Sequence, residues 1–259
     1  MGETGEDISQ GDIDTEHPEG FSSGKYHDAF GRVAESPHQR KYLKNVYQRS
    51  LKLVEEAGWG NPILRKHAEV LLCGTGSSET SSTFVDTIRE LNPNAKVHIL
   101  DREQFPLDKS RERLQGELAT GLANIEFHHE DALHTSFDDS SLSAIETDLF
   151  LQFFSPDAKQ ALVREWARIL EPGGIITTRD FVQSTGGPIE KRASNLHQRI
   201  IAKRLHVPTY PTTSIGLSNL FKEAGLEVRI TPVRLPIVGA QIPLFSHIIA
   251  HKLETPSIE

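Results

Sequence analysis

The stretch VLLCGTGSSE at residues 70–79 decides the fold, because an apolar run passes into a glycine loop and then into polar residues that favour a helix. Gly74 and Gly76 let the backbone approach a ligand closely, since glycine has no Cβ and adopts positive φ without steric cost. A helix that follows such a loop offers unpaired N–H groups to the ligand. The stretch therefore predicts a strand, a binding loop and a helix.

Similar units follow along the chain. Apolar runs alternate with polar segments of helical length, and the breaker sequence at residues 92–94 ends the first helix. This order predicts an α/β fold with a doubly wound, mostly parallel sheet and helices on both faces. The expected strands are residues 68–73, 96–100, 124–128, 142–148, 174–181, 226–233 and 246–253.

Composition limits the class of protein. The chain has 259 residues and a single cysteine, Cys73, which lies in an apolar run. One cysteine excludes an internal disulfide framework and a multi-cysteine metal site. No apolar run reaches the about eighteen residues that a membrane span needs, and the start of the chain lacks the order of a signal peptide. We therefore expect a soluble, cytoplasmic protein with no membrane partner.

The formal charge of −8 is concentrated near the start of the chain. Residues 1–20 hold seven acids and no Lys or Arg, so the rest of the chain holds 29 acids against 28 bases. We expect residues 1–24 to form a disordered acidic tail, with an acidic docking segment as the alternative. The nearly neutral body has no basic stripe interleaved with aromatic residues, so nucleic acid is not the favoured partner.

Residues 25–66 are expected to form a helical cap before the first strand. Within them, residues 38–57 have the apolar spacing of an amphipathic helix. Such a helix could cover the binding crevice as a lid, or it could pack on the sheet edge with its basic face in solvent. The stripe expected to be buried is Leu43, Val46, Tyr47, Ser50, Leu51 and Val54.

Two acidic residues come at the ends of predicted strands, where the crevice is expected. Asp101 comes 25 residues after Gly76, at the end of the second strand, where a carboxylate can accept hydrogen bonds from both hydroxyls of a ribose. Asp131, followed by Ala132, comes after the third strand and could accept a hydrogen bond from the exocyclic amine of adenine. Each acid could instead be an ordinary turn residue at the end of a strand.

At these residues the chain resembles the class I S-adenosylmethionine-dependent methyltransferases. The loop at residues 74–77 looks like the first motif of that family, and Asp101 and Asp131 look like its ribose and adenine acids. DLFLQFF at 148–154 resembles the segment beside the methyl donor, and LEPGG at 170–174 resembles the turn before strand five. The resemblance implies a seven-stranded sheet with a C-terminal antiparallel strand, and S-adenosylmethionine as cofactor. The cofactor-binding residues it implies are Gly74, Thr75, Gly76, Ser77, Asp101, Arg102, Asp131, Ala132, Asp148 and Leu149.

The chain also departs from the family pattern. Leu72 stands where the family has an acid that helps to hold the amino group of the donor, Ser78 replaces the third glycine, and Ser143 replaces the acid of strand four. Glu79, Asp148 or backbone carbonyls could take the amino group instead. These losses leave open a non-catalytic binding or scaffold subunit with the same fold. A nicotinamide-dependent oxidoreductase is less favoured, because Glu79 stands where the third glycine of G-x-G-x-x-G belongs.

Methyl transfer needs alignment above all, and a general base only if the acceptor must lose a proton. His197 is the first choice for that base, with His128, His129 and His134 behind it, although each could be an exposed histidine without a role. His128 and His129 are adjacent on a predicted strand and point to opposite faces, so they could not easily share one ion. We therefore predict no metal site.

Residues 186–214 form an insert after strand five, where the family builds its acceptor pocket. The expected acceptor is a small molecule, and a basic insert suits an anionic metabolite, although a solvated helix face would look the same. A homodimer that pairs through residues 38–57 and this insert is a further open alternative. The charged residues of the insert are Glu190, Lys191, Arg192, Arg199, Lys203 and Arg204.

Overall fold

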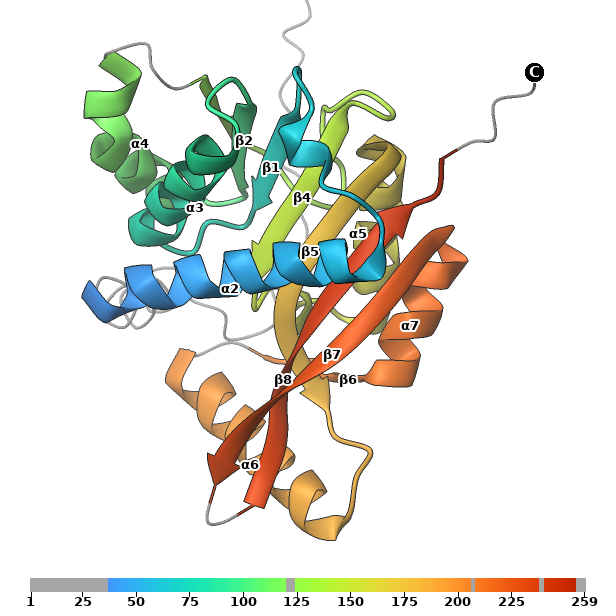
Figure 1. The fold of residues 1–259 in the computed structure, drawn as a ribbon. Coiled ribbons are helices and arrows are strands. Elements are labelled where there is room, and N and C mark those ends of the chain that lie inside the picture. Colours follow the sequence, from blue (N-terminus) through green and yellow to red (C-terminus); the bar gives the residue numbers. More distant parts are fainter. Residues whose placement is uncertain (1–36, 120–123, 206–207, 238–239, 255–259) are drawn as a thin grey trace, which may run out of the picture.

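The computed structural model describes residues 37–119, 124–205, 208–237 and 240–254, and these residues build one α/β unit around a mixed sheet (Figure 1). The order of the strands across the sheet is β3-β2-β1-β4-β5-β8-β7, and β6 pairs with β5 off this path. The strands are β1 (Glu69–Cys73), β2 (Lys96–Asp101), β3 (Ile125–His129), β4 (Leu142–Asp148), β5 (Leu170–Gln183), β6 (Thr212–Thr213), β7 (Leu226–Ile237) and β8 (Ala240–Lys252).

Helices connect β1 to β2, β2 to β3 and β4 to β5, which are parallel neighbours, as the alternating pattern predicts. The five strands from β1 to β5 pair in parallel, whereas β8 runs antiparallel to both β5 and β7. The helices are α2 (Pro37–Ala57), α3 (Ser78–Leu91), α4 (Gln104–Ala119), α5 (Pro156–Ile169), α6 (Pro188–Leu205) and α7 (Ser214–Glu223), with short 3-10 helices η1 (Pro62–Leu64) and η2 (Leu151–Phe153).

The predicted doubly wound α/β fold is confirmed, with two differences in detail. The sheet has eight strands instead of seven, because the two-residue strand β6 adds to the end of β5. Two residues are too few to produce a hydrophobic pattern, so this strand was not predicted. LEPGG was expected to be a turn before strand five, but β5 begins at Leu170 and a register shift between Leu142 and Ala144 absorbs the extra residues.

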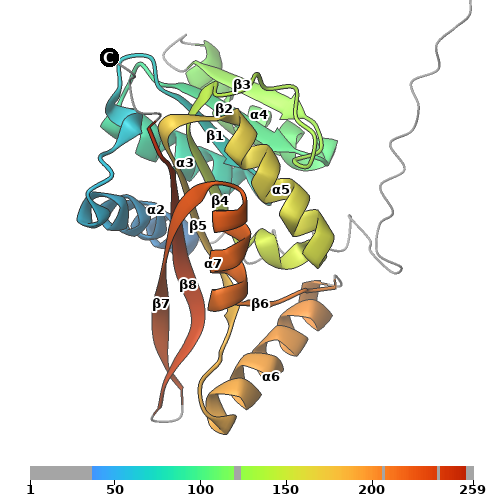
Figure 2. The same cartoon turned by 90° about the vertical axis from the view of Figure 1, so that its right-hand side faces the viewer.

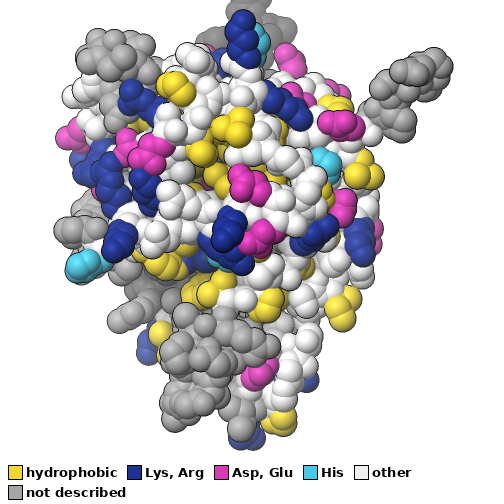
Figure 3. Space-filling model, in the orientation of Figure 1, with side chains coloured by type: hydrophobic (Ala, Val, Ile, Leu, Met, Phe, Trp, Pro, Cys, Tyr) yellow, Lys and Arg dark blue, Asp and Glu magenta, His cyan; other side chains and the backbone are white. Residues whose placement is uncertain are grey.

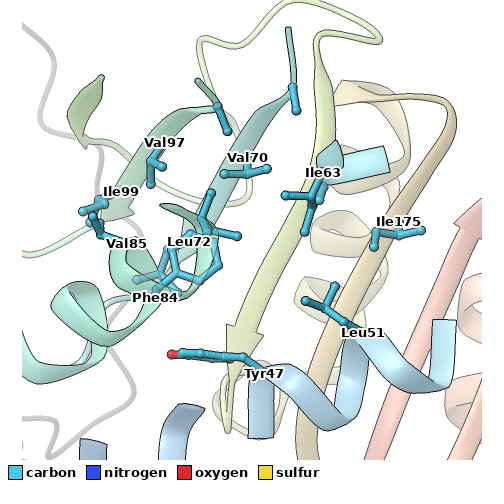
Figure 4. Packing of buried hydrophobic residues seen from close by; sticks show 14 of the residues in the cluster. Tyr47, Leu51, Ile63, Val70, Leu72, Phe84, Val85, Val97, Ile99 and Ile175 are labelled. Atoms are coloured by element: carbon cyan, nitrogen blue, oxygen red, sulfur yellow. The ribbon is translucent and has the colours of Figure 1, made fainter. Parts of the chain in front are cut away.

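Two apolar layers hold the helices to the sheet. One layer joins α2, α3 and α4 to one face, and the other joins α5 and α7 to the opposite face (Figure 2). Figure 4 shows Tyr47 and Leu51 of α2 entering the first layer, which includes Leu72 and Phe84. The second layer contains the fully buried Trp166 of α5. Burial of each large apolar side chain contributes about 1.5–3 kcal/mol.

Helix α2 lies across the face of the sheet rather than on its edge. It packs against α3, β5 and β8, and all six residues of the predicted stripe are buried. On its outer side Lys44 pairs with Glu90 at 2.6 Å and Arg40 pairs with Asp86, so acids of α3 balance part of its basic face. Figure 3 shows basic and acidic side chains intermixed over this side of the molecule.

Some predictions fall outside this description. The predicted tail at residues 1–24 and the first part of the predicted cap, residues 25–36, lie outside the described residues. The boundaries of the predicted cap and of the methyltransferase domain therefore remain predictions. Among the residues described, no helix combines the length and the apolar character that crossing a bilayer requires.

Candidate functional site

The candidate site lies at the carboxyl ends of the parallel strands, where β1 has β2 on one side and β4 on the other. This position is the switch point of the strand order, and open α/β sheets bind ligands outside the carboxyl ends of their strands at such a point. Three predicted elements meet here: the glycine loop after β1, Asp101 at the end of β2 and Asp148 at the end of β4.

The glycine loop has the backbone conformation that its sequence predicts. Gly74 and Gly76 have φ values of +80° and +59°, in the left-handed region that favours glycine. The N–H of Gly74 donates to the carbonyl of Leu100 at 2.8 Å, which ties the loop to β2. Ser77 then caps α3, because its hydroxyl accepts a hydrogen bond from the N–H of Thr80 at 3.3 Å.

Phe150 covers the glycine loop and was not among the predicted site residues. A Cβ added to Gly74 would lie 2.5 Å from Cε2 of this ring, so only glycine fits against it. The ring is held by Phe154 and Trp166, with centroid distances of 4.8 Å and 6.5 Å. Leu149 precedes it with φ of +54°, an uncommon conformation for a branched residue. The aromatic residues of DLFLQFF were the sequence signal for this contact.

Asp101 joins the loops that follow β1 and β2. Its Oδ2 accepts a hydrogen bond from the N–H of Thr75, and its Oδ1 accepts one from the N–H of Glu103, both at 2.9 Å. A carboxylate oxygen can accept more than one hydrogen bond, so these turn contacts do not by themselves exclude contacts to hydroxyl groups. The turn role and the ribose role are therefore compatible. The neighbouring Arg102 is exposed, and its carbonyl accepts a hydrogen bond from Nε2 of His129 at 2.9 Å.

Asp131 carries a buried acceptor that lacks a donor. Its Oδ1 accepts from the N–H of Leu133 at 2.9 Å, whereas its Oδ2 is buried and has no partner within the described part of the chain. A buried polar atom without a hydrogen bond is costly, so a donor group of a ligand would stabilise this oxygen. Ala132 beside it is buried. An exocyclic amine of adenine would supply such a donor, so the residues fit a bound adenosyl group.

Asp148 was expected beside the donor, but it has a protein partner. Nε and Nη2 of Arg179 donate to its Oδ1 and Oδ2 at 2.9 and 2.8 Å, and the two side chains are only 10% and 4% exposed. Burial raises the pKa of Asp148 and lowers the pKa of Arg179 to about 10. The guanidinium also lies against the rings of Tyr42 and Phe245, at 4.7 and 5.1 Å. Asp148 therefore positions Arg179 under α2.

The other three positions considered for the amino group of the donor also lack a free carboxylate. Leu72 is buried in the apolar layer under α2, as Figure 4 shows. Glu79 accepts from Nη2 of Arg113 at 2.5 Å and lies 3.8 Å from Nη1 of Arg40. Ser143 is buried in β4. This leaves the backbone carbonyls as the remaining expected acceptors.

A small, mostly apolar cavity lies under α2, and the sequence did not indicate it. It has a volume of about 10 Å³, close to the space that one water molecule needs, and Tyr47, Glu146 and Thr177 line it. Thr177 donates to Oε2 of Glu146, whereas Oε1 of Glu146 and the Tyr47 hydroxyl have no hydrogen-bond partner among the described residues. Burial raises the pKa of Glu146 well above its ordinary value. Glu146 pairs in register with Leu72, so β4 supplies a carboxyl group beside the position where β1 lacks one.

The insert after β5 places α6 beyond the carboxyl ends of the strands, packed against β5 and β8 (Figures 1 and 2). His197 lies within α6, but its side chain is outside the described part of the structure, as is that of Arg204. Glu190 accepts a hydrogen bond from the hydroxyl of Ser184 at 3.0 Å. The exposed basic residues of this helix are Lys191, Arg192, Arg199 and Lys203.

The other histidines proposed as bases lie elsewhere. His128 is half-buried at the outer side of the sheet, whereas His129 and His134 are exposed. His128 pairs in register with Leu100 and His129 with Asp101, so the two rings project to opposite faces as predicted. Nothing in these positions brings His128 to the glycine loop.

Comparison with known proteins matches the region of the chain that contains this candidate site. Residues 70–174 match the family model described as a methyltransferase domain, from β1 to the start of β5. The matched region contains the glycine loop, Asp101 and Asp131. Residues 70–174 are therefore similar to a methyltransferase domain, and the fold is that of solved methyltransferase structures.

Two curated relatives match part of the chain. A protein of Aspergillus fumigatus named Methyltransferase tpcH is 33% identical over 132 residues, which are 49% of this chain and 43% of that protein. An uncharacterized protein of Haemophilus influenzae is 25% identical over 130 residues, which are 49% of this chain and 47% of that protein. The chain thus spans about half the length of the curated relatives it matches.

Solved structures share the fold at low identity. A SAM-dependent methyltransferase from Methanosarcina mazei has a TM-score of 0.54 at 21% identity, covering 74% of this chain and 95% of that one. The YcgJ protein from Bacillus subtilis has a TM-score of 0.56 at 16% identity, covering 80% and 100%. A chain from the complex of the Haloferax volcanii Trm112 methyltransferase activator with a candidate methyltransferase has a TM-score of 0.59 at 15% identity, covering 89% and 98%.

Proposed function

We propose that this protein transfers a methyl group from S-adenosylmethionine to a small acceptor molecule. The observation that carries this proposal is the buried Oδ2 of Asp131, an acceptor without a donor at the switch point of a methyltransferase-type sheet. The bound donor would supply an electrophilic methyl group on a sulfonium ion. The acceptor atom forms a bond to that methyl group, and the electron pair of the broken C–S bond stays on sulfur.

The binding residues divide the work of holding the donor. The loop Gly74, Thr75, Gly76 and Ser77 provides close backbone approach, and the N-terminus of α3 provides free N–H groups. Asp101 accepts from the ribose hydroxyls, and Asp131 with Ala132 binds the adenine. Arg102 and Leu149 lie beside the ribose and the adenine. Asp148 instead acts through its ion pair with Arg179. Alignment of this kind can lower a barrier by about 7–11 kcal/mol.

The acceptor is proposed to be a small anionic molecule that enters beside α6. The support is the set of exposed basic side chains on α6, a helix that lies beyond the carboxyl ends of the strands. His197 remains the proposed base for an acceptor that must lose a proton. The single cysteine, Cys73, is buried, and burial raises the pKa of its thiol. A reduced thiol of this kind is compatible with the proposed cytoplasmic location.

Calorimetric titration with S-adenosylmethionine and S-adenosylhomocysteine tests the proposed cofactor. We expect micromolar binding, loss of binding in Asp101→Ala, and at least about tenfold weaker binding in Asp131→Asn. Asp131→Asn replaces an acceptor oxygen by a donor, which cannot bind an amine. Asp157→Asn, an exposed acid in the first turn of α5, is the matched control and is expected to bind normally. Normal affinity in both Asp101→Ala and Asp131→Asn would reject the proposed site.

The alternative is a non-catalytic subunit that keeps the methyltransferase fold. Its support is the lack of a free carboxylate for the amino group of the donor. Leu72 has no carboxylate, and Glu79 and Asp148 are each paired with an arginine. This alternative predicts no calorimetric signal from the isolated chain, with binding restored by a partner chain. A nicotinamide cofactor is disfavoured further because Glu79 is buried and paired with Arg113. Saturable binding of NADH by fluorescence would reverse that order.

A further inference from the structure

A second group of chemically active side chains lies on the outer part of the sheet, away from the glycine loop. His98 of β2 pairs in register with Glu126 of β3, and His128 follows two residues later on the same strand. Residues two apart on a strand point to one face, so the three side chains project together. His98 is buried and packs edge-on against Phe137 at 5.0 Å between centroids.

The three donor atoms have the spacing of metal ligands. Nδ1 of His98 lies 2.9 Å from Nε2 of His128 and 3.6 Å from Oε2 of Glu126, and the last two atoms are 3.9 Å apart. A tetrahedral zinc ion with bonds of about 2.0–2.2 Å places its ligand atoms about 3.3–3.6 Å from one another. Shifts of a few tenths of an ångström would therefore bring all three atoms into contact with one ion.

Neighbouring groups orient these donors. Nε2 of His98 lies 2.9 Å from Oε2 of Glu69, which is the carboxylate–histidine arrangement that fixes the ring of a metal ligand. Nδ1 of His128 lies 3.6 Å from Oε1 of Glu130. Lys96 donates to Oε1 of Glu126 at 3.0 Å, which leaves Oε2 facing the two imidazoles. In each ring, one nitrogen thus lies near a carboxylate, and the other nitrogen faces the point between the three donor atoms.

We propose that His98, Glu126 and His128 bind a divalent ion of the zinc type, with water at the fourth position. Two imidazoles and a carboxylate suit zinc better than the hard ions Mg²⁺ and Ca²⁺, which prefer oxygen ligands. Glu126 is 49% exposed, so ion and water can reach the site from solvent. The ion would bind the edge strand β3 to β2. The proposal does not depend on methyl transfer, because none of its residues belongs to the donor site.

This site differs from the metal cluster that the sequence brought into view. His128 and His129 were considered together and point to opposite faces, and His129 donates to the carbonyl of Arg102 instead. His98 replaces His129 as the second imidazole, and it stands 30 residues before His128 in the chain. Only the pairing of β2 with β3 brings the two rings together.

Metal titration of the chelator-treated full chain tests the proposal. Zn²⁺ is added in competition with a chromophoric chelator, and Co²⁺ is added separately because its visible absorption reports tetrahedral geometry. We expect one tight Zn²⁺ site in the unaltered protein and loss of that site in both Glu126→Gln and His128→Gln. Glu69→Gln is expected to weaken binding about 10–100-fold, as removal of an orienting partner does.

His129→Gln is the matched control, since it removes a histidine from the adjacent position on the other face. It is expected to keep the site, and Zn²⁺ is expected to raise the Tm of this variant and of the unaltered protein but not of Glu126→Gln. Glu126 is exposed, so its variant should fold. Absence of the tight site from the unaltered protein would overturn the proposal. Equal loss in His128→Gln and His129→Gln, or a site that survives Glu126→Gln, would do the same.

Discussion

The two halves of the sheet hold their polar groups in different ways. On the side of β1 and β2, carboxylates accept hydrogen bonds from nearby backbone N–H groups, as Asp101 does from Thr75 and Glu103. On the side of β4, β5 and β8, buried side chains pair with one another, as Asp148 does with Arg179 under α2. The first arrangement fixes a binding loop through hydrogen bonds from backbone N–H groups. The second depends on two buried charged side chains that neutralise each other, so its residues should be far more sensitive to the loss of one partner.

Removal of Arg179 should have the largest effect on stability. Arg179→Met leaves Asp148 buried without its bidentate partner, and breaking such a pair costs about 3–5 kcal/mol. Lys44→Met is the matched control, because the exposed Lys44–Glu90 pair should contribute at most about 1 kcal/mol. Urea unfolding measures both free energies. Similar losses of unfolding free energy in the two variants would show that burial does not distinguish the two kinds of pair. The double variant Arg179→Met with Asp148→Leu should recover much of the stability that Arg179→Met loses.

Gly74→Ala tests the binding loop on the side of β1 and β2. Gly74 and Gly58 have almost equal φ values of +80° and +81°, but only Gly74 has a ring within reach of the added Cβ. Both variants therefore pay about 1–2 kcal/mol for the left-handed backbone, and Gly74→Ala should cost about 1–3 kcal/mol more for the overlap with Phe150. Thermal and urea unfolding measure the difference.

The same pair of variants tests the donor site. Gly74→Ala should abolish binding of S-adenosylhomocysteine by calorimetry, whereas Gly58→Ala should retain it. Adding Phe150→Ala to Gly74→Ala should remove the extra stability cost, because the added Cβ then no longer overlaps a ring. If Gly74→Ala and Gly58→Ala were equally stable, the ring of Phe150 would move away without cost and its place over the loop would be unimportant.

The contrast between the halves also explains what could be predicted from the sequence. The loop at residues 74–77 and the buried stripe of α2 follow from local spacing, and the structure has both. The partner of Asp148 and the cavity beside Glu146 could not be predicted, because they depend on which segments become neighbours. Leu72 is an example: the sequence shows a missing acid, and only the register of β1 with β4 shows Glu146 beside it.

The short strand β6 and the aromatic contacts between distant segments could not be predicted for the same reason. The strand β6 has two residues and takes its conformation from β5. Phe150 was part of a recognised aromatic segment, but its position over Gly74 depends on the left-handed turn at Leu149. His98 gave no signal alone because its partner Glu126 is on another strand. Local patterns thus predicted the elements, and pairing between strands determined the chemistry.

His247 should make stability on the α2 side depend on acid pH. Its Nδ1 lies 3.0 Å from the Ser50 hydroxyl, and burial, with smaller contributions from Arg179 and Arg49, lowers its pKa to about 4 from an ordinary 6.5. The unfolded state therefore binds the proton more tightly. The stability from the neutral ring is present above pH 6.5 and is lost as the pH falls toward 4, with a slope of at most about 1.4 kcal/mol per pH unit.

Urea unfolding between pH 7 and pH 4 measures that slope. His247→Gln should flatten it, because glutamine does not titrate. His134→Gln, at an exposed histidine, is the control and should keep the slope of the unaltered protein. A slope that stays unchanged in His247→Gln would assign the acid sensitivity to other groups.

The smallest expected effect separates stability from binding. Ser77 and Ser155 cap α3 and α5, and each hydroxyl accepts a backbone N–H at 3.3 Å. Replacing either by alanine should cost about 1 kcal/mol of stability, because the same capping bond is lost. Only Ser77 ends the glycine loop, so only Ser77→Ala should also weaken binding of S-adenosylhomocysteine, by several-fold. Equal weakening in both variants would mean that binding follows global stability and that the order of the loop is not what Ser77 contributes.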